Sequence, residues 1–287
     1  MKLGIHSSIF PEGLNVLQKI EYTAKTGYNA IELEIGPLWA SSSKPPRNVV
    51  ARFLDKNDRK EILEHAKSNN VRIQSLCFGM FVSPSYHIAD PDPRYRDLAV
   101  SQLKETIELA TDLQSEVVLI FVPETSPMQM LLNCDQKRSL VKESLLKLVR
   151  FAEDTGIIIG LEPCAPTFFV GWKDILTIIN AINSDNVKCY YDVGNAVHFG
   201  LSPDEELMHL GKAITQIHIK EPNQLLENKT ISFPSVGQGT MNWASIFSAL
   251  TKIDYQRYLI VEHYPDPSNP YRVANESRNF LEKFLKF

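Results

Sequence analysis

The fold is decided by the stretch from Ile157 to Asn195, which reads IIIGLEPCAPTFFVGWKDILTIINAINSDNVKCYYDVGN. It holds two short, almost entirely apolar runs, Ile157–Pro163 and Val187–Val193, on either side of a longer segment. Such runs are typical of strands that are covered on both faces. The stretch is therefore interpreted as strand, helix, strand, which is the repeating unit of a parallel sheet with right-handed crossovers.

The same alternation continues through the whole chain of 287 residues, with helical periodicity between the runs. Six further runs are predicted to be strands: Leu3–Ser7, Ala30–Ile35, Val71–Phe78, Val117–Val122, Ile214–Lys220 and Tyr258–Tyr264. Eight units of about 36 residues favour a closed (β/α)8 barrel, a TIM barrel, formed by residues 1–287 as a single domain. The alternative is an open doubly wound sheet, because periodicity does not show closure.

Helix starts and loops complete this outline. Asp92 before Pro93 is a predicted N-cap, and Asp135 is a second one. Three long loops, Gly36–Arg52, Gly79–Pro93 and Pro222–Met241, follow predicted strands. They are candidates for a lid or for substrate contact, with variable surface loops as the alternative.

Composition excludes several classes of protein. The net charge is −4 and no basic stripe is visible, which argues against nucleic-acid binding. The chain has no apolar run of about 18 residues and no signal-peptide pattern, so we expect a cytoplasmic protein without membrane contact. Its four cysteines are widely spaced without a Cys-x-x-Cys pair, which fits neither a zinc ribbon nor a disulfide scaffold.

Polar side chains stand at the ends of the last four predicted strands: Glu162, Asp192, His218 and Glu262. A charge in an apolar strand is costly unless it is paired or binds a cation. In a barrel, these four residues would converge at one mouth. Three carboxylates and one imidazole suit a divalent cation, Mn²⁺ or Mg²⁺ first, with Zn²⁺ and Co²⁺ as alternatives. The other interpretation is four separately buried residues, each satisfied by a neighbour.

Alternation of side chains along each strand extends this prediction. Lys220 shares the face of His218, so it should point to the mouth beside the cation. His263 is on the opposite face from Glu262 and should point outward.

Two further histidines are candidates for substrate contact. His6 lies on the first predicted strand and could touch a polar group of a substrate, or be a buried structural residue. His87 lies in the loop after the third predicted strand and could belong to a lid, or to an ordinary surface loop.

These features resemble the xylose-isomerase-like TIM-barrel superfamily of sugar isomerases and epimerases. The second half is most similar to L-xylulose (L-ribulose) 5-phosphate 3-epimerases and to D-tagatose 3-epimerases. The stretches that carry the resemblance are Asp192-Val193-Gly194-Asn195, His218-Ile219-Lys220, Gly237-Gln238-Gly239 and Leu259-Ile260-Val261-Glu262.

The resemblance implies an enzyme that acts on a ketose or ketose phosphate through a metal-stabilised enediolate. Glu162, Asp192, His218 and Glu262 would hold one divalent ion, and Glu162 and Glu262 would be the acid/base pair on opposite faces of the sugar. Asn195, like Lys220, would contact the substrate. An isomerase could instead return the proton to the neighbouring carbon on the same face. Homo-oligomers are common in this superfamily.

Some positions depart from the pattern. D-tagatose 3-epimerases carry Glu, His and Arg where this chain has Phe168, Asn195 and Gln224, which argues against a copy of the free-ketohexose site. Phosphate-sugar epimerases tend to have a basic residue near Ser232, with Lys229 close but out of register. Phosphorylation of the substrate therefore stays open.

Three rival functions remain at this stage. A dehydratase of the inosose or dehydroshikimate type would use the same enediolate to eliminate water. An endonuclease IV-like repair enzyme would need more histidine ligands and a basic surface. A barrel that binds a sugar without chemistry has no feature in the sequence that distinguishes it.

Overall fold

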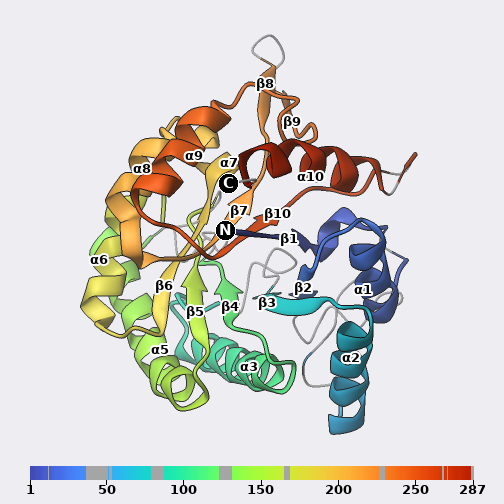
Figure 1. The fold of residues 1–287 in the computed structure, drawn as a ribbon. Helices are drawn as coiled ribbons and strands as arrows, with labels where there is room; N and C mark the ends of the chain where they lie inside the picture. The colour runs from blue at the N-terminus through green and yellow to red at the C-terminus, as the bar shows by residue number, and fades with distance from the viewer. Residues whose placement is uncertain are drawn as a thin grey trace.

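Eight parallel strands close into a barrel in the computed structural model (Figure 1). The barrel strands are β1 (Lys2–His6), β2 (Ala30–Ile35), β3 (Arg72–Phe78), β4 (Val117–Ile120), β5 (Ile158–Leu161), β6 (Val187–Asp192), β7 (Ile214–Ile219) and β10 (Tyr258–Val261). They follow one another around the barrel in chain order, and β1 pairs with both β2 and β10. The predicted TIM barrel is therefore confirmed, and the open sheet is ruled out.

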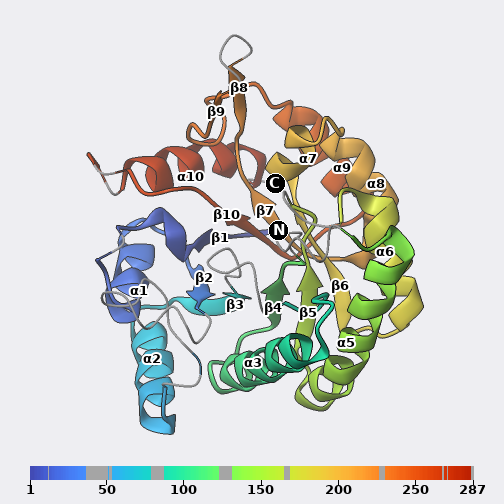
Figure 2. The same ribbon diagram turned by 180° about the vertical axis from the view of Figure 1, so that it is seen from behind.

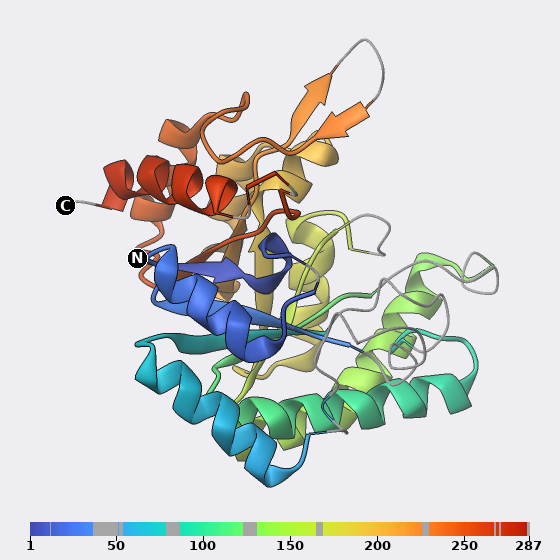
Figure 3. The same cartoon turned by 90° about the vertical axis from the view of Figure 1, so that its right-hand side faces the viewer.

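Helices cover the outside of the barrel as a ring (Figures 1 and 2). Their bounds are α1 (Val16–Lys25), α2 (Lys56–Ser68), α3 (Pro93–Asp112), α5 (Cys134–Thr155), α6 (Trp172–Ile182), α7 (Val193–His198), α8 (Pro203–Leu210), α9 (Trp243–Lys252) and α10 (Arg272–Leu285). None of the helices within the described ranges is long and apolar enough to cross a membrane. A hairpin of β8 (Asn223–Leu225) and β9 (Thr230–Ser232) projects beyond the ring (Figure 3).

The structure describes residues 1–11, 13–36, 51, 54–78, 87–122, 131–164, 169–225, 230–266, 268–269 and 271–285, with the backbone only for β8 and β9. Most of the first two predicted loops lies outside these ranges. The third predicted loop, Pro222–Met241, contains the short hairpin of β8 and β9.

Helix caps follow local sequence, with one correction. Asp92 caps α3 as predicted, accepting the Arg94 N–H at 2.9 Å. The predicted cap at Asp135 is wrong, because the N-cap of α5 is Asn133. Asn133 and Gln136 form a reciprocal capping box, which satisfies two backbone N–H groups at the helix start. Asp135 lies in the first turn, where its charge faces the positive end of the helix dipole.

The core has an outer and an inner part. The large outer cluster packs the helices against the strands. Inside the barrel are two small apolar clusters, one around Val117, Leu119 and Tyr190 and one of Ala30, Tyr258 and Ile260. The Tyr190 ring needs the space at Gly160, where an added Cβ would lie 3.0 Å from its Cδ2 atom. Polar side chains occupy the rest of the interior, which TIM barrels usually fill with branched apolar residues.

Candidate metal centre

Four side chains meet at the carboxyl ends of β5, β6, β7 and β10. They are Glu162, Asp192, His218 and Glu262, and one ligand atom from each lies within 4.8 Å of all the others. The first three are at most 2% exposed, and the Glu262 side chain is 25% exposed. The structure thus brings together the four residues that the sequence singled out, at the end of the barrel where TIM-barrel enzymes act.

Asp192 has two structural connections. It ends β6, and its Oδ1 atom caps the short helix α7 by accepting the N–H groups of Gly194 at 2.7 Å and Asn195 at 3.1 Å. Its other oxygen, Oδ2, lies 2.9 Å from the Lys220 ammonium. The cap fixes the carboxylate so that Oδ2 faces the mouth of the barrel.

Glu162 is buried with only part of its hydrogen-bonding capacity used. Its Oε1 atom accepts from Asn195 Nδ2 at 3.1 Å and is 3.3 Å from His218 Nδ1. Its Oε2 atom has no hydrogen-bond partner among the described residues. Burial is the main cause that raises the pKa of Glu162 to about 8, while His218 opposes the shift.

Lys220 lies among these carboxylates, as side-chain alternation along β7 predicted. Its Nζ atom is 2.7 Å from Glu262 Oε2, in addition to its contact with Asp192. Burial alone would lower the pKa of Lys220, but the two carboxylates raise it well above its usual range. Burial likewise acts to raise the pKa of Glu262, but Lys220 and His218 hold it well below its usual range. Three carboxyl groups thus meet at the mouth of the barrel, and Lys220 is paired with two of them.

This donor set fits a divalent cation. A buried carboxylate oxygen without a donor, Glu162 Oε2, is costly for a protein unless something else binds it. Carboxylate oxygens together with one imidazole nitrogen are usual ligands of Mn²⁺, Mg²⁺ and Zn²⁺.

A cavity of about 270 Å³ opens beside the four residues. Its lining includes aromatic rings and polar groups, among them Phe121, Phe233, Tyr264, Asn195, His198 and Lys220. The volume is close to the lower end of the range for small-molecule sites, about 300 Å³. The cavity therefore suits a small polar ligand with one face against aromatic carbon.

The predicted substrate contacts divide into two groups. Asn195 and Lys220 line the cavity. His6 and His87 are buried and are not among the described residues of the lining. His6 Nε2 lies 3.6 Å from a buried glutamate, and His87 Nδ1 accepts the Ala89 N–H at 3.2 Å. His263, expected to face outward, contacts the backbone oxygens of Phe233 and Tyr264.

The Gly237-Gln238-Gly239 turn is held by Glu221, which is 0% exposed. This carboxylate accepts the N–H groups of Gly237 at 2.8 Å and Met241 at 3.0 Å, and the indole N–H of Trp243 at 2.6 Å. A Cβ at Gly239 would collide with the same carboxylate, which explains the glycine. The Gly237 N–H in the turn and the Met241 N–H just after it are thus committed to Glu221. The side chains of Phe168, Gln224, Lys229 and Ser232 lie outside the described part of the structure.

Sequence reasoning missed Glu32 on β2, which lies beneath the site. Its Oε1 atom is 2.6 Å from His218 Nε2, and the residue is 0% exposed. A weaker signal was available, because Glu32 is a charged residue in an apolar strand, although it lies in the middle of β2 and not at its end.

Comparison with known proteins agrees with this architecture. The family model of the xylose isomerase-like TIM barrel matches residues 20–284. The chain therefore belongs to the xylose isomerase-like TIM barrel family.

Similar sequences and structures give narrower comparisons. An uncharacterised protein of Methanocaldococcus jannaschii, MJ1311, is 26% identical, with 100% of this chain and 90% of that protein aligned. An inosose dehydratase of Bacillus thuringiensis is 23% identical, with 93% and 88% aligned. Among solved structures, the 3-keto-D-glucoside 4-epimerase YcjR of E. coli superposes with a TM-score of 0.78 at 20% identity, covering 99% of both chains. At these identities, the structural likeness supports the fold alone.

Proposed function

We propose that this protein is a divalent-metal-dependent sugar or sugar-phosphate isomerase or 3-epimerase. The observation that carries the proposal is the convergence of Glu162, Asp192, His218 and Glu262 beside a small cavity, with one buried carboxylate oxygen lacking a donor. A D-psicose 3-epimerase from Clostridium cellulolyticum, solved with D-tagatose, has a similar fold, with a TM-score of 0.79 at 18% identity over all of both chains. A putative L-ribulose-5-phosphate 3-epimerase of Haemophilus influenzae is 21% identical over 92% of this chain.

In this proposal, the four residues hold one divalent ion, with Mn²⁺ the first candidate and Mg²⁺, Co²⁺ and Zn²⁺ as alternatives. When bound, such an ion polarises a substrate carbonyl and stabilises negative charge that develops on its oxygen. An IolI protein with a binding zinc atom has a similar fold, with a TM-score of 0.76 at 19% identity.

Proton transfer falls to Glu162 and Glu262. Both carboxyl groups line the cavity, and they come from strands on different sides of His218. Removing a proton next to a carbonyl needs a base within hydrogen-bond reach, and inversion at that carbon needs an acid on the other face. Two carboxyl groups that approach one ligand from different strands meet this requirement. Return of the proton to the adjacent carbon would give an isomerase.

Asn195 and Lys220 would bind and orient the substrate. Asn195 donates to Glu162 Oε1, so it also fixes the carboxyl group that would move the proton. Lys220 presents an ammonium at the lining and can donate to a hydroxyl or phosphate oxygen.

Hydrogen exchange tests this proposal directly. Metal-stripped protein would be loaded with Mn²⁺ and incubated in D₂O with ketoses and ketose 5-phosphates, followed by mass spectrometry. One deuterium at C3 with a new epimer supports an epimerase, and deuterium in an aldose product supports an isomerase. No exchange with any sugar, in protein that binds the metal, contradicts both.

A dehydratase is the second candidate, and a specific observation favours it. Inosose dehydratases of several bacteria are among the similar sequences, at 22–24% identity. The same base would remove a proton next to a carbonyl while a hydroxyl leaves from the neighbouring carbon. New ultraviolet absorbance of an enone with a cyclic keto-polyol would support this candidate, and its absence across a panel of such ketones would remove it.

A further inference from the structure

Glu32 is a glutamate with no exposed surface, deep in the barrel beneath the proposed metal centre. Both of its oxygens accept hydrogen bonds. Oε2 accepts from Ser75 Oγ at 2.5 Å and from Tyr190 OH at 2.6 Å, and Oε1 faces His218 Nε2 at 2.6 Å. A buried carboxylate is tolerated when it is paired and hydrogen-bonded in this way.

The hydroxyl groups around Glu32 have a fixed direction. The Gln216 amide Nε2 donates to Ser75 Oγ at 2.7 Å and to Tyr190 OH at 2.6 Å. Each hydroxyl has one proton, so a hydroxyl that accepts from Gln216 directs its own proton to Glu32. Glu32 is thus surrounded by donors and can only accept.

This arrangement continues down the barrel interior as a polar column, which we define as Glu32, Ser75, Tyr190, Gln216, Gln74 and Glu116. Gln74 Nε2 donates to Gln216 Oε1 at 3.3 Å and to Glu116 Oε2 at 3.1 Å. Glu116 is in turn held by Arg72 at 2.8 Å and Arg257 at 3.1 Å. The column therefore connects Glu32 to an ion-pair cluster at the opposite end of the barrel, which leaves Glu32 little freedom to move.

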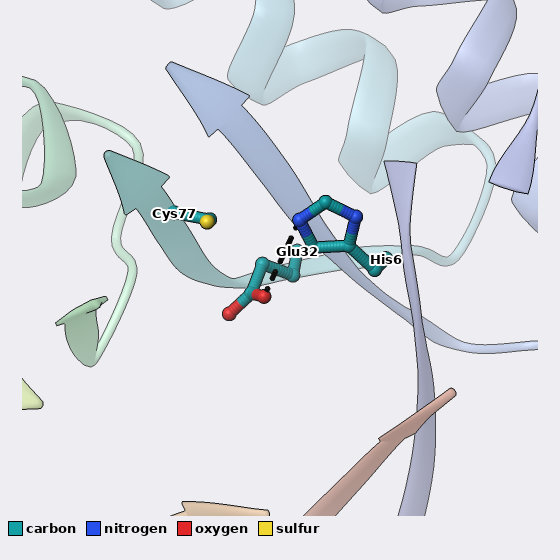
Figure 4. A group of neighbouring side chains, drawn as sticks. All are labelled: His6, Glu32 and Cys77. Carbon is teal, nitrogen blue, oxygen red and sulfur yellow. Dashed lines mark ion pairs between the residues drawn. The ribbon is translucent and has the colours of Figure 1, made fainter. Parts of the chain in front are cut away.

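A second metal site is the obvious alternative role for Glu32. Its carboxylate, the His6 ring and the Cys77 thiol lie close together on β1, β2 and β3 (Figure 4). However, the backbone N–H of Ser8 donates to His6 Nδ1 at 3.1 Å, so the neutral ring carries its proton on Nε2, facing Glu32. Burial also raises the pKa of the Cys77 thiol well above its usual range. In His6, Glu32 and Cys77, the atoms that could bind a metal are therefore engaged in hydrogen bonds or protonated, and these residues are not a set of free metal ligands.

We propose that Glu32 is a positioning residue that holds the His218 ring with its proton on Nε2 and its Nδ1 lone pair toward the metal centre. The inference rests on the proposed function. His218 Nδ1 lies 3.3 Å from both Glu162 Oε1 and Glu262 Oε2, so it faces the group of four. A carboxylate on the far nitrogen of a metal-binding histidine fixes which nitrogen can bind the metal.

The test uses the Glu32→Gln variant of the full chain, with Zn²⁺ as the probe. Zn²⁺ affinity would be measured by competition with a chromophoric chelator, and the His218 ring by ¹⁵N NMR of histidine-labelled protein. In the wild type, we expect one Zn²⁺ per chain, bound through Nδ1 with the proton on Nε2. In Glu32→Gln, we expect affinity to fall by about 10- to 100-fold and the Nδ1–H tautomer to appear.

Glu206→Gln is the matched control, since Glu206 is also a buried glutamate. It accepts the N–H of Trp172, the first residue of α6, at 2.7 Å, away from His218. Its variant should lower thermal stability without changing Zn²⁺ affinity or the His218 signals. If Glu32→Gln does not fold, Tyr190→Phe replaces it, because that variant removes one donor to Glu32 and keeps the His218 contact. It should weaken Zn²⁺ binding by about 2- to 10-fold and shift the His218 signals, with the proton still on Nε2.

Three results would overturn the inference, and they differ from one another. The first is a Glu32→Gln variant with unchanged Zn²⁺ affinity and unchanged His218 signals, or the same result in Tyr190→Phe if Glu32→Gln does not fold. It would make Glu32 purely structural while leaving the proposed function intact. A second Zn²⁺ that disappears in Cys77→Ser would make Glu32 a ligand. Absence of Zn²⁺ at His218 in the wild type would contradict the proposed metal centre itself, and this inference with it.

Discussion

His218 lies between two buried glutamates that differ in one respect. Glu32, on one side, has hydrogen-bond donors on both oxygens. Burial acts to raise the pKa of Glu32, but His218 and the other donors around Glu32 hold that pKa below its usual range. Glu162, on the other side, has one oxygen without a donor, and its pKa is raised. The difference teaches that burial alone does not assign a role. A saturated carboxylate can only orient its neighbour, whereas an unsaturated one is available to a cation or a proton.

The largest expected effect is on turnover. Glu162→Gln and Glu262→Gln should each reduce deuterium incorporation from D₂O by at least about 10²- to 10⁴-fold, because a carboxyl group that moves a proton is lost. Circular dichroism and thermal melting should show that both variants still fold. Retention of wild-type exchange in either variant would refute the role assigned to that residue.

Metal binding should stabilise the folded chain, with Glu162, the glutamate that has a free oxygen, as one of the ligands. At a free Mn²⁺ concentration of 100 times Kd, the free energy of unfolding should rise by about 2.7 kcal/mol, since the ion binds only the folded chain. Denaturant titration with and without EDTA measures this. At the same Mn²⁺ concentration, Glu162→Gln should show a smaller gain, and an equal gain would place the ion elsewhere.

Glu221 offers a third buried glutamate, saturated like Glu32 but without contact with His218. Trp243→Phe removes the indole N–H that Glu221 accepts at 2.6 Å and should cost about 1–3 kcal/mol of unfolding free energy. Mn²⁺ affinity should stay unchanged, as judged by calorimetry of variant and wild type side by side. A large loss of affinity would mean that the Gly237–Gly239 turn is part of the metal centre.

The smallest expected effect is on the free energy of unfolding and concerns the N-cap of α5, which is exposed on the surface. Asn133→Ala should cost about 1 kcal/mol by removing the capping box of α5. Asp135→Ala should cost less, because Asp135 makes no cap. Chemical denaturation of the two variants compares them, and the reverse order would restore Asp135 as the cap.

Much of the fold could be predicted from the sequence because strand and helix periods differ and the count of eight runs suggested closure. Closure itself depends on the pairing of β1 with β10, a contact between the two ends of the chain that periodicity does not show. That residues 1–287 work as a single domain, and that the protein is cytoplasmic, stay predictions.

The candidate site was predictable to the extent that charged residues interrupt apolar strand ends. That rule brought out Glu162 and Asp192. Glu32 lies in the middle of β2, where that rule does not apply. Its role depends on hydrogen-bond partners from β3, β6 and β7, which can be identified only in three dimensions. The N-cap of α5 was mispredicted for a similar reason. Asn133 and Asp135 are both suitable cap residues, and only the structure shows which of them caps the helix.

Anomalous diffraction from a crystal soaked in Mn²⁺ or Zn²⁺ tests the central claim most directly. The account predicts one peak per chain, bound by Glu162, Asp192, His218 Nδ1 and Glu262, with Glu32 still on His218 Nε2. A peak between His6, Glu32 and Cys77 instead, or no peak beside Glu162, would contradict it.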